Sequence, residues 1–421
     1  MMKILLIYDK RTFPLRKVLK DHLLSFERYI KNSKIFYFNC AYRYNLGFLS
    51  NIDYDLIIFH WSFAGVRCET NKGRIRHLKY EKKISSLKNY KCKKIIFPQD
   101  EFTSMDLLCN FINDFKINIV FSVAPETEWE KIYKTVNFKQ VKFVRVLTGY
   151  LDNDTIQNWK KNKSYEDRNF DVGYRVVSTA KWGRFNLLKQ KIADIFINNG
   201  KKYNLRNNIK VGDQFFKLGE EWLKFLSDCR FTIGVEGGSF LLDWDGSLSS
   251  KINEFIINNP SANYDTLERN CIPKGKDGEI KVVAISPRHL EACLTKTAQI
   301  LVEGEYNNIL LPNIHFIPLK KDFSNIEQVI KSIKDKNKYK LITERAFKDI
   351  VTSKRYTYEN FIRVVLKNLN LKKQKNSINL PEKFIYNLNL ICDFYTNLIV
   401  YLISFFRMIK KKSLSILTLN H

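Results

Sequence analysis

The densest group of residues able to do chemistry lies in the stretch ISPRHLEACLTK. Ser286, followed by a proline, is a favourable N-cap and predicts a helix that begins at this point. Arg288, His289 and Glu291 then fall in the first turns, beside free backbone N–H groups and the positive end of the helix dipole. A phosphate suits this position, and Glu291 is the carboxylate that could accept hydrogen bonds from a ribose diol. The structural alternative is a glutamate that favours the helix dipole and an arginine in a surface ion pair.

Two more carboxylates follow where the next apolar run, AQILV, ends. Glu303 and Glu305 flank Gly304 directly after this run. Because the run predicts a buried strand, we expect both side chains at the carboxyl edge of a sheet, where parallel sheets bind their ligands.

Two series of strands and helices are needed to position these residues. Short apolar runs alternate with helical stretches up to about residue 150, and the alternation restarts near residue 170. Strands that are apolar on both faces and separated by helices indicate parallel sheets covered on both sides. We therefore expect an α/β protein with two Rossmann-like domains facing a central cleft. The expected ranges are 1–150, a hinge over 151–169, and 170–369 with an insertion at 240–282.

The second half resembles the donor-binding domain of GT-B glycosyltransferases of the group 1 family, in particular the branch similar to spore-coat-maturation glycosyltransferases. The resemblance rests on Arg288, Glu291 and Ala292 in an R-x-x-E-A pattern, and on the strand and glycine-containing loop that follow. The closing segment ERAFKDIVTSKRYTYENFIRVVL is also similar. Motifs match over about 170–367, and the first half matches only in its fold. The resemblance implies a nucleotide-sugar on the second domain, with Glu291 on the ribose and an acceptor approaching from the first domain.

The chain departs from this family at one position. Many relatives carry a second glutamate eight residues before the ribose-binding one, whereas Val283 stands there. Glu236, at the end of the apolar run in GVEGGS, could replace it across the insertion. Gly237 and Gly238 would let the backbone approach a ligand closely.

Basic residues are expected where the first strand of the second half meets its first helix. Arg175 and Lys181 occupy this position, and the resemblance implies that they neutralise the diphosphate leaving group. Arg184 and Lys189, further along, are less specific candidates. A solvated basic helix face is the alternative for each of them.

Three residues at strand ends of the first half could be the general base that an inverting transfer needs on the acceptor hydroxyl. Asp100 and Glu101 are the first candidates, and His60 is the second. The structural alternatives are N-capping by Asp100 and a core histidine at position 60. A retaining mechanism would need no such base, and the sequence leaves the stereochemistry open.

Asp243 and Asp245, in DWDG, look like the D-x-D pair that binds a metal–nucleotide in the other large glycosyltransferase fold. Two carboxylates at this spacing could share a divalent ion with a diphosphate. An ordinary Asx-type turn and a contact to the donor or acceptor are the alternatives. Because GT-B enzymes usually need no metal, we expect no metal and no cofactor, with the nucleotide-sugar as a substrate.

Composition narrows the function classes further. The chain has 421 residues with 71 Lys and Arg against 43 Asp and Glu, a formal net charge of +28, which favours an anionic partner. The hydrophobic content of 45% excludes a disordered chain. Eight cysteines without a C-x-x-C pair favour a reduced, cytoplasmic setting without a zinc site. The lack of Walker-type, G-x-S-x-G and H-E-x-x-H motifs excludes the common NTPase and hydrolase classes.

Residues 370–421 differ in character from the rest, because a polar linker leads into an apolar, aromatic stretch with a basic end. The uncharged run between Asp393 and Arg407 would be about 20 Å of helix, short of the roughly 30 Å of hydrocarbon in a bilayer. An amphipathic helix lying in the membrane plane therefore fits better than a spanning one, with contact through 384–412. The alternatives are a helix packed back on the first domain and a helix bound to a partner.

These observations predict a cytoplasmic glycosyltransferase of the hexosyltransferase type at the inner face of a membrane. It would move a sugar from a nucleotide-sugar to a glycan or lipid-linked acceptor during assembly of a surface polysaccharide or glycoconjugate. A non-catalytic sugar- or nucleotide-binding protein that retains the fold is the alternative, motivated by Val283. Nucleic acid is not expected as a partner, since there is no recognition motif and the basic residues form no single stripe.

Overall fold

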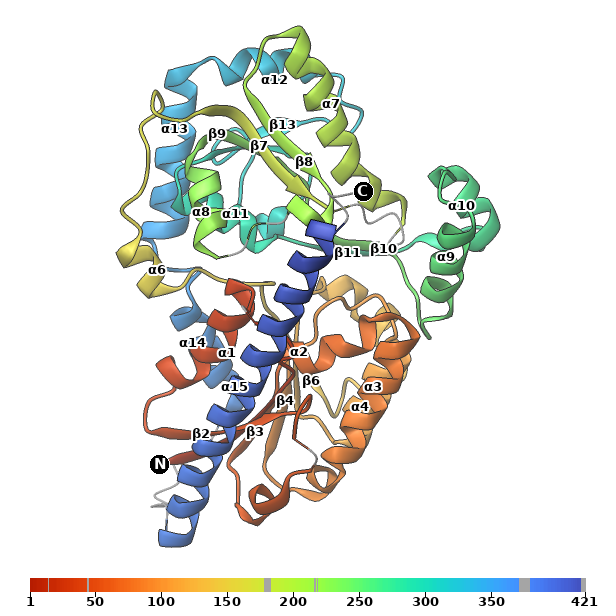
Figure 1. Ribbon diagram of the computed structural model, residues 1–421, viewed down its shortest axis with the longest axis vertical. Helices are drawn as coiled ribbons and strands as arrows, with labels where there is room; N and C mark the ends of the chain where they lie inside the picture. Colours follow the sequence, from red (N-terminus) through yellow and green to blue (C-terminus); the bar gives the residue numbers. More distant parts are fainter. Residues whose placement is uncertain are drawn as a thin grey trace.

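Two parallel β-sheets, each covered by helices, form two domains stacked along the long axis of the molecule in this computed structural model (Figure 1). The structure describes the whole chain except residues 14, 44, 178–182, 216, 218, 371–378 and 418–421. The two sheets contain six and five strands, so the expected α/β architecture with two Rossmann-like domains is confirmed.

The first domain is built on a sheet with the strand order β2-β1-β3-β4-β5-β6, in which all neighbours are parallel. Residues 4–7 in the inner strand β1 are fully buried, because helices cover both faces of the sheet. The six apolar runs of the sequence correspond to these strands: β1 (Met2–Tyr8), β2 (Ser33–Asn39), β3 (Leu56–Phe59), β4 (Lys93–Ile96), β5 (Ile119–Ser122) and β6 (Lys142–Arg145).

Helices of the first domain bury one apolar side each. In α4, Leu108, Phe111 and Ile112 recur at helical spacing and enter the core between the helix and the sheet. Side chains also enter the two cores of this domain from α1 (Lys17–Tyr29), α2 (Trp61–Ala64), α3 (Thr70–Lys83) and α5 (Trp129–Ile132), in addition to α4 (Met105–Asp114).

The second domain has a parallel sheet with the order β13-β12-β9-β7-β8. Its strands are β7 (Phe170–Val176), β8 (Asn207–Val211), β9 (Cys229–Gly234), β12 (Ala298–Val302) and β13 (Ile317–Leu319). Its covering helices are α7 (Leu188–Lys202), α8 (Glu220–Ser227), α11 (Pro287–Leu294), α12 (Ile326–Ile333) and α13 (Lys336–Ala346). The helix that the sequence predicts at Ser286 is α11, and the strand predicted from AQILV is β12.

Two chain crossings connect the domains and run side by side. The first passes Leu151 and α6 (Asn153–Asn158), and the second leads into α14 (Tyr358–Leu369). Leu151 forms a β-bridge with Thr357 between them. The sequence places residues up to 369 in the second domain, but the apolar side of α14 packs in the core of the first domain beside Phe26 of α1.

The insertion forms a separate small unit at the side of the cleft (Figure 1). Strands β10 (Gly237–Leu241) and β11 (Asp277–Ala284) pair antiparallel, and the helices α9 (Ser247–Asn258) and α10 (Tyr264–Cys271) pack on a small core of their own. The antiparallel ribbon extends slightly beyond the expected range at both ends. Its base is tied to the first domain, since Asp243 N donates to Phe102 O at 2.8 Å and Ser104 N donates to Asp243 O at 2.8 Å.

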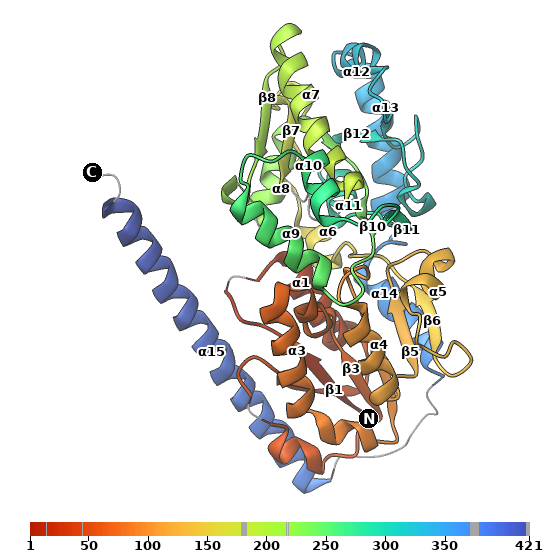
Figure 2. The ribbon, with the colours of Figure 1, turned by 90° about the vertical axis from the view of Figure 1, so that its right-hand side faces the viewer.

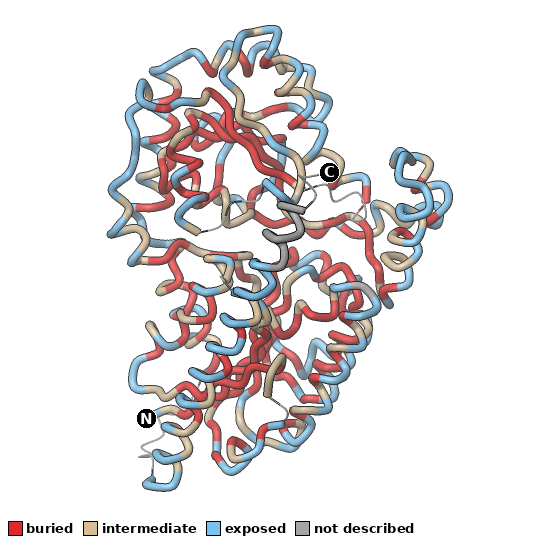
Figure 3. The backbone as a smooth tube through the Cα atoms, in the orientation of Figure 1, coloured by how far each residue is buried: buried red, intermediate tan, exposed pale blue. Residues whose placement is uncertain are grey.

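The C-terminal helix α15 (Leu380–Leu417) lies along the first domain, in contact with the edge strand β2 (Figures 1 and 2). The structure therefore shows the helix packed on the first domain, one of the three arrangements that the sequence leaves open. Its outward side is exposed, in contrast to the buried strands beside it (Figure 3). Among the described residues, one helical span, Leu380–Ile409, is long and apolar enough to cross a membrane by length and composition.

Candidate functional site

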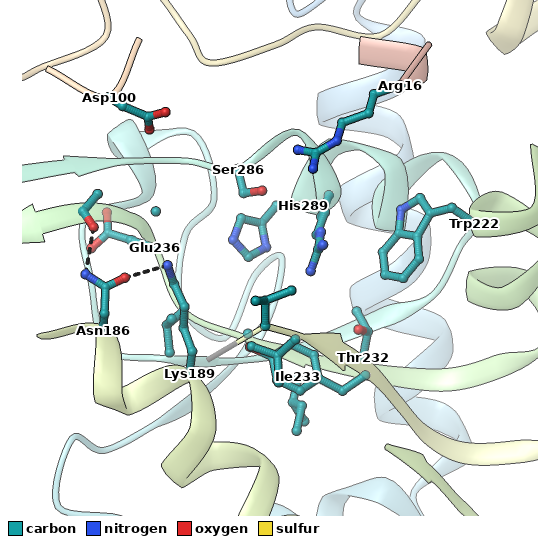
Figure 4. Close-up of a pocket in the computed structure, with 18 of the residues that line it drawn as sticks. Arg16, Asp100, Asn186, Lys189, Trp222, Thr232, Ile233, Glu236, Ser286 and His289 are labelled. Carbon is teal, nitrogen blue, oxygen red and sulfur yellow. Dashed lines mark hydrogen bonds between the residues drawn. The ribbon is translucent and has the colours of Figure 1, made fainter. Parts of the chain in front are cut away.

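A cavity of about 890 Å³ lies between the domains, at the carboxyl ends of β7 and β9 (Figure 4). The first domain contributes Arg16, Asp100 and Phe102 to its wall. The second domain contributes the remainder, from the ends of β7 and β9, the turn into β10, the start of α7 with the turn before it, α8, and the start of α11. This is the place in a parallel sheet where ligands are expected to bind.

Three cations from the described part of the chain line the cavity. Arg288 Nη1 donates to the carbonyl oxygen of Arg175 at 2.7 Å, and its guanidinium lies 5.1 Å from the centre of the Trp222 ring. Lys189 Nζ donates to Asn186 Oδ1 at 2.7 Å, and burial, together with the charge of Arg288, lowers the pKa of Lys189 to about 8. Arg16 is the third cation and belongs to the first domain. A bound diphosphate would offset the mutual repulsion of these charges.

The start of α11 faces the same cavity. Ser286 is the N-cap with extended backbone (φ −84°, ψ 146°), and a proline occupies the first helical turn, as the sequence predicts. Ser286, Arg288 and His289 all line the cavity. The positive end of the helix dipole therefore adds to the three side-chain cations.

The tautomer of His289 follows from its neighbour Gln299. Gln299 Nε2 donates to the carbonyl oxygen of His289 at 3.2 Å, so its Oε1 accepts from His289 Nδ1 at 3.0 Å. His289 Nε2 is then an acceptor, and among the described residues no donor meets hydrogen-bond geometry at this buried atom; the ring also interacts with the backbone of Val235. Burial lowers the pKa of His289 to about 4, so the ring is neutral at pH 7. An unsatisfied acceptor in the wall of a cavity suits a hydroxyl group of a ligand.

Glu236, Gly237 and Gly238 lie together in the wall of the cavity. Glu236 Oε1 accepts from Tyr306 N at 2.7 Å, and its second oxygen lies so close to Gly304 that a Cβ there would overlap it. Gly238 has φ +123°, and its carbonyl oxygen accepts from Asn186 Nδ2 at 3.0 Å. Burial raises the pKa of Glu236.

The structure also brings Glu236 next to the position where the chain departs from the glycosyltransferase pattern. In the β10–β11 ribbon, Gly238 pairs with Val283 and Gly237 pairs with Ala284. Val283 is buried, while Glu236, which precedes this pair of glycines, lines the cavity. The ribbon thus places a carboxylate beside the strand in which the expected glutamate is missing.

Arg175 does not line the cavity. Its Nη1 donates to Asn208 O at 2.6 Å and its Nη2 to Asn208 Oδ1 at 2.8 Å, and the guanidinium lies 4.0 Å from the centre of the Phe225 ring. The side chain therefore holds β7 to β8 and α8. Arg175 contacts two residues of the cavity wall, since its Nη1 donates to the carbonyl oxygen of Tyr174 at 2.8 Å and its own carbonyl oxygen accepts from Arg288. Lys181 lies outside the described residues, and Arg184 is exposed with Asp265 and Glu268 as ion-pair partners.

The other three carboxylates of the second domain that the sequence predicts for the site lie next to the cavity or further away from it. Glu291 Oε2 accepts from Trp222 Nε1 at 2.9 Å, so the glutamate contacts the site through this indole. Burial raises the pKa of Glu291 to about 7. Glu303 is exposed, and Glu305 pairs with Lys281. None of these three carboxylates is in the cavity wall formed by the described residues.

Two of the three base candidates in the first domain are buried within the fold. Glu101 accepts from Ser122 Oγ at 2.6 Å and from Val123 N at 2.7 Å, and it also pairs with the hydroxyl of Tyr133. Burial raises the pKa of Glu101. Its carboxylate joins the ends of β4 and β5, and does not reach the cavity wall.

His60 is the N-cap of α2 and lies in the core. His60 Nδ1 accepts from Ser62 N at 3.0 Å, so Nε2 carries the proton and donates to His22 Nδ1 at 2.9 Å. Burial lowers the pKa of both rings, to about 3 for His22. The core-histidine alternative describes this arrangement, since His60 does not line the cavity.

Asp100 is the base candidate that the structure brings to the cleft. It is exposed, has φ +52°, and lines both the interdomain cavity and a second cavity of about 1,040 Å³ in the first domain. Arg16 also lines both cavities. The two spaces therefore meet at these residues.

The D-W-D segment forms turns at the base of the insertion. Asp243 Oδ1 accepts from Leu248 N at 3.1 Å, and Asp245 Oδ1 accepts from Ser247 N at 3.0 Å. These contacts are those of an Asx-type turn, one of the alternatives that the sequence leaves open. Within the described parts of the chain, no group of three or more His, Cys, Asp or Glu side chains is arranged to hold a metal ion.

Among the residues of the cavity wall that sequence reasoning missed are Arg16, Asn186 and Trp222. Arg16 lies between β1 and α1, at the carboxyl end of a predicted strand, so the rule about ligand sites at this edge could have found it. Trp222 lies within a helix, on its buried side, and carries no signal in sequence that separates it from an ordinary core residue.

No family model matches the sequence, and no curated protein matches it. Solved structures do share its fold. An α-glucosyltransferase in complex with UDP-glucose and DNA containing an abasic site aligns with a TM-score of 0.53 and 13% identity, over 87% of this chain and 99% of that one. A glycosyltransferase from Rickettsia africae gives 0.49 and 10%, over 89% and 99%. Anabaena HepE in complex with UDP and glucose gives 0.46 and 11%, over 87% and 100%. The two facing parallel sheets and the first of these likenesses show a GT-B type fold.

Proposed function

We propose that the protein is a glycosyltransferase that binds a nucleotide-sugar in the interdomain cavity. The observation that carries the proposal is the set of groups around this one space: three cations, a helix N-terminus, a buried carboxylate and an unsatisfied neutral histidine. Cations at a helix N-terminus suit a diphosphate, and Glu236 with His289 Nε2 suits the hydroxyl groups of a sugar or ribose. The GT-B type fold agrees with this use of the cleft.

In the proposed reaction, Arg16, Lys189 and Arg288 stabilise the negative charge that develops on the leaving diphosphate. The bond between the anomeric carbon and the diphosphate oxygen breaks, and a bond to the acceptor oxygen forms. Asp100, at the junction with the second cavity, is placed to accept the proton of the acceptor hydroxyl if the transfer inverts configuration. Closure of the two domains around the donor would exclude water that could hydrolyse it.

The finer assignments made from the sequence are parts of the same proposal. They are a hexosyl donor, membership of the branch similar to spore-coat-maturation glycosyltransferases, a glycan or lipid-linked acceptor in surface polysaccharide or glycoconjugate assembly, and a cytoplasmic location. We propose neither a metal cofactor nor nucleic acid as a partner. Membrane contact through residues 384–412 depends on a different part of the chain and does not follow from the donor cavity.

Thermal unfolding with a panel of nucleotides tests the proposal directly. The purified chain is heated with UDP, GDP, ADP, CMP and their common sugar conjugates, and one nucleotide should raise the Tm by about 5 °C at a hundredfold excess over its Kd. The matching sugar nucleotide is then incubated with candidate acceptors, and product is measured by mass spectrometry. Binding without transfer or hydrolysis would indicate the non-catalytic alternative. No shift with any nucleotide would contradict the donor site.

A further inference from the structure

The helix α15 carries its polar and apolar sides in the reverse of the usual order. A helix on the surface of a protein in water normally packs an apolar stripe on the core and exposes its polar side. In α15, Asn389, Asp393 and Asn397 face the first domain, whereas the opposite side exposes a run of aliphatic and aromatic residues. The polar side of α15 is therefore suited to the edge of the first domain, and the apolar side is suited to an apolar surface.

The side that faces the domain is fixed by hydrogen bonds to the edge of the sheet. Asn389 Oδ1 accepts from Tyr37 N at 2.8 Å and Asn389 Nδ2 donates to Tyr37 O at 2.9 Å, so one amide satisfies two backbone groups of the edge strand β2. One turn later, the hydroxyl of Tyr8 donates to Asp393 Oδ1 at 2.7 Å. A matched pair of backbone bonds fixes the rotation of the helix about its axis.

Two lysines of the first domain also hold α15 to the domain, one on each side of the contacts made by Asn389 and Asp393. Lys3 Nζ donates to Glu382 Oε1 at 2.7 Å, and Lys10 Nζ donates to Asn397 Oδ1 at 2.6 Å. The polar groups on this side of α15 are thus used in docking to the domain. They leave the opposite side to face outward along the described length of the helix.

The outward side is apolar without interruption from residue 390 to 406, where every exposed residue is aliphatic or aromatic. The most exposed of them include Ile391, Phe394, Tyr395, Ile399 and Phe406, at 47–65%. At about 1.5 Å per residue this surface is roughly 25 Å long, and at about 100° per residue it covers half of the helix circumference. Figure 2 shows the C-terminal part of α15 standing clear of the second domain.

We propose that this outward face binds the interface of a lipid bilayer, with α15 lying in the membrane plane. A bilayer accommodates the whole apolar half of a helix, whereas pairing with a second copy would bury only a narrow seam and leave the rest in water. Crossing the bilayer would separate Asn389 and Asp393 from their partners in the first domain and bring them into hydrocarbon. Aromatic side chains, frequent on this face, favour the headgroup level.

The charge at the end of the helix fits an anionic leaflet. Arg407 is exposed, and the sequence continues with Lys410, Lys411 and Lys412. Basic residues next to an apolar face add attraction to anionic lipids. Arg407 also lines the second cavity, which meets the donor cavity at Asp100. A membrane-embedded acceptor would therefore reach Asp100 from the bilayer side; this last step depends on the proposed function, and bilayer binding does not.

Flotation with vesicles tests the docking surface. The full chain is mixed with vesicles of phosphatidylcholine containing 30% phosphatidylglycerol, or of phosphatidylcholine alone, and centrifuged through a sucrose gradient. We expect it to float with the anionic vesicles. The variant L398S/L402S/F405S should lose more than about tenfold in partitioning, because three apolar side chains leave the lipid-facing surface. The control L78S/I257S/L341S, which removes exposed apolar residues elsewhere, should float like the parent.

Each alternative for the outward face of α15 predicts a different experimental result. A chain that does not float, or a triple variant that floats as well as the parent, would overturn the proposal. A dimer by light scattering that dissociates in the triple variant, without vesicle binding, would assign the surface to a second copy. Resistance to alkaline carbonate extraction would indicate a spanning helix. Nucleotide-dependent thermal shifts of both variants are measured in parallel, so failure of the donor site and failure of the bilayer surface are distinguished.

Discussion

In both domains, titratable residues follow strands of a parallel sheet that faces the cleft, but these residues form different kinds of contact in the two domains. In the second domain, Glu236 and His289 line the cavity, and no group among the described residues donates a hydrogen bond to His289 Nε2. In the first domain, Glu101 and His60 also follow strands, but their hydrogen-bonding atoms are used inside the fold. A titratable residue at a strand end is therefore a candidate for chemistry only where the local backbone leaves its polar atoms available.

The backbone after each strand explains this difference. After β9, the two glycines lead into the ribbon β10–β11, which opens the wall of the cavity at Glu236. After β3, the chain turns at once into α2, and His60 is used as the N-cap of this helix. Substitutions of groups that hold the fold should therefore lower stability, and substitutions of groups that face the cleft should affect binding or turnover.

The largest expected effect is on stability, from Glu101→Ala. This change leaves the buried Ser122 hydroxyl, Val123 N–H and Tyr133 hydroxyl without their acceptor, which should cost about 3 kcal/mol of unfolding free energy, measured by urea unfolding. Asp100→Asn is the matched control, because asparagine tolerates the left-handed backbone at this exposed position. It should keep the parental stability and, in an inverting transfer, lose turnover. Equal losses of unfolding free energy in the two variants would show that Glu101 and Asp100 do not differ in their contribution to the fold.

The next largest effect concerns nucleotide binding, to which two arginines of the second domain should contribute differently. Arg288→Met removes a cation from the cavity wall and should weaken binding of the preferred nucleoside diphosphate by about thirtyfold, or about 2 kcal/mol, by calorimetric titration. Arg175→Met should lower the Tm, since the bonds to Asn208 are lost, and leave the Kd nearly unchanged. Similar Kd values for the two variants would show that the cavity does not hold the diphosphate near Arg288.

The histidine pair makes the first domain sensitive to acid. Because the pKa of each buried ring lies below its value in the unfolded chain, protonation favours unfolding, and stability falls as the pH drops below about 6.5. His60→Asn keeps an N-cap for α2 and removes one of the two groups. The loss of unfolding free energy between pH 7 and pH 5 should be about 1.5 kcal/mol smaller in the variant. An unchanged pH dependence would show that the pair is not the cause.

The sequence predicted the elements of the fold better than the roles of individual side chains. Strands such as β1 and β3, apolar on both faces, and the N-cap at Ser286 are encoded locally, so pattern and capping rules found them. The placement of α14 in the first domain depends on contacts between distant segments and left no local signal. The same is true of Arg175, whose partners Asn208 and Phe225 are defined only by sheet packing.

The smallest expected effect concerns Lys189 and the pH dependence of donor binding. With its pKa lowered to about 8, Lys189 loses its proton as the pH rises from 7 to 9, while a bound diphosphate favours the charged form. The Kd of the nucleotide should therefore increase about tenfold over this range. Lys189→Arg, which stays protonated, should bind with an affinity that hardly changes with pH. A parental Kd that is constant from pH 7 to 9 would place the diphosphate away from Lys189. Arg288 would then be the remaining cation of the second domain at the cavity, opposite Arg16 of the first domain.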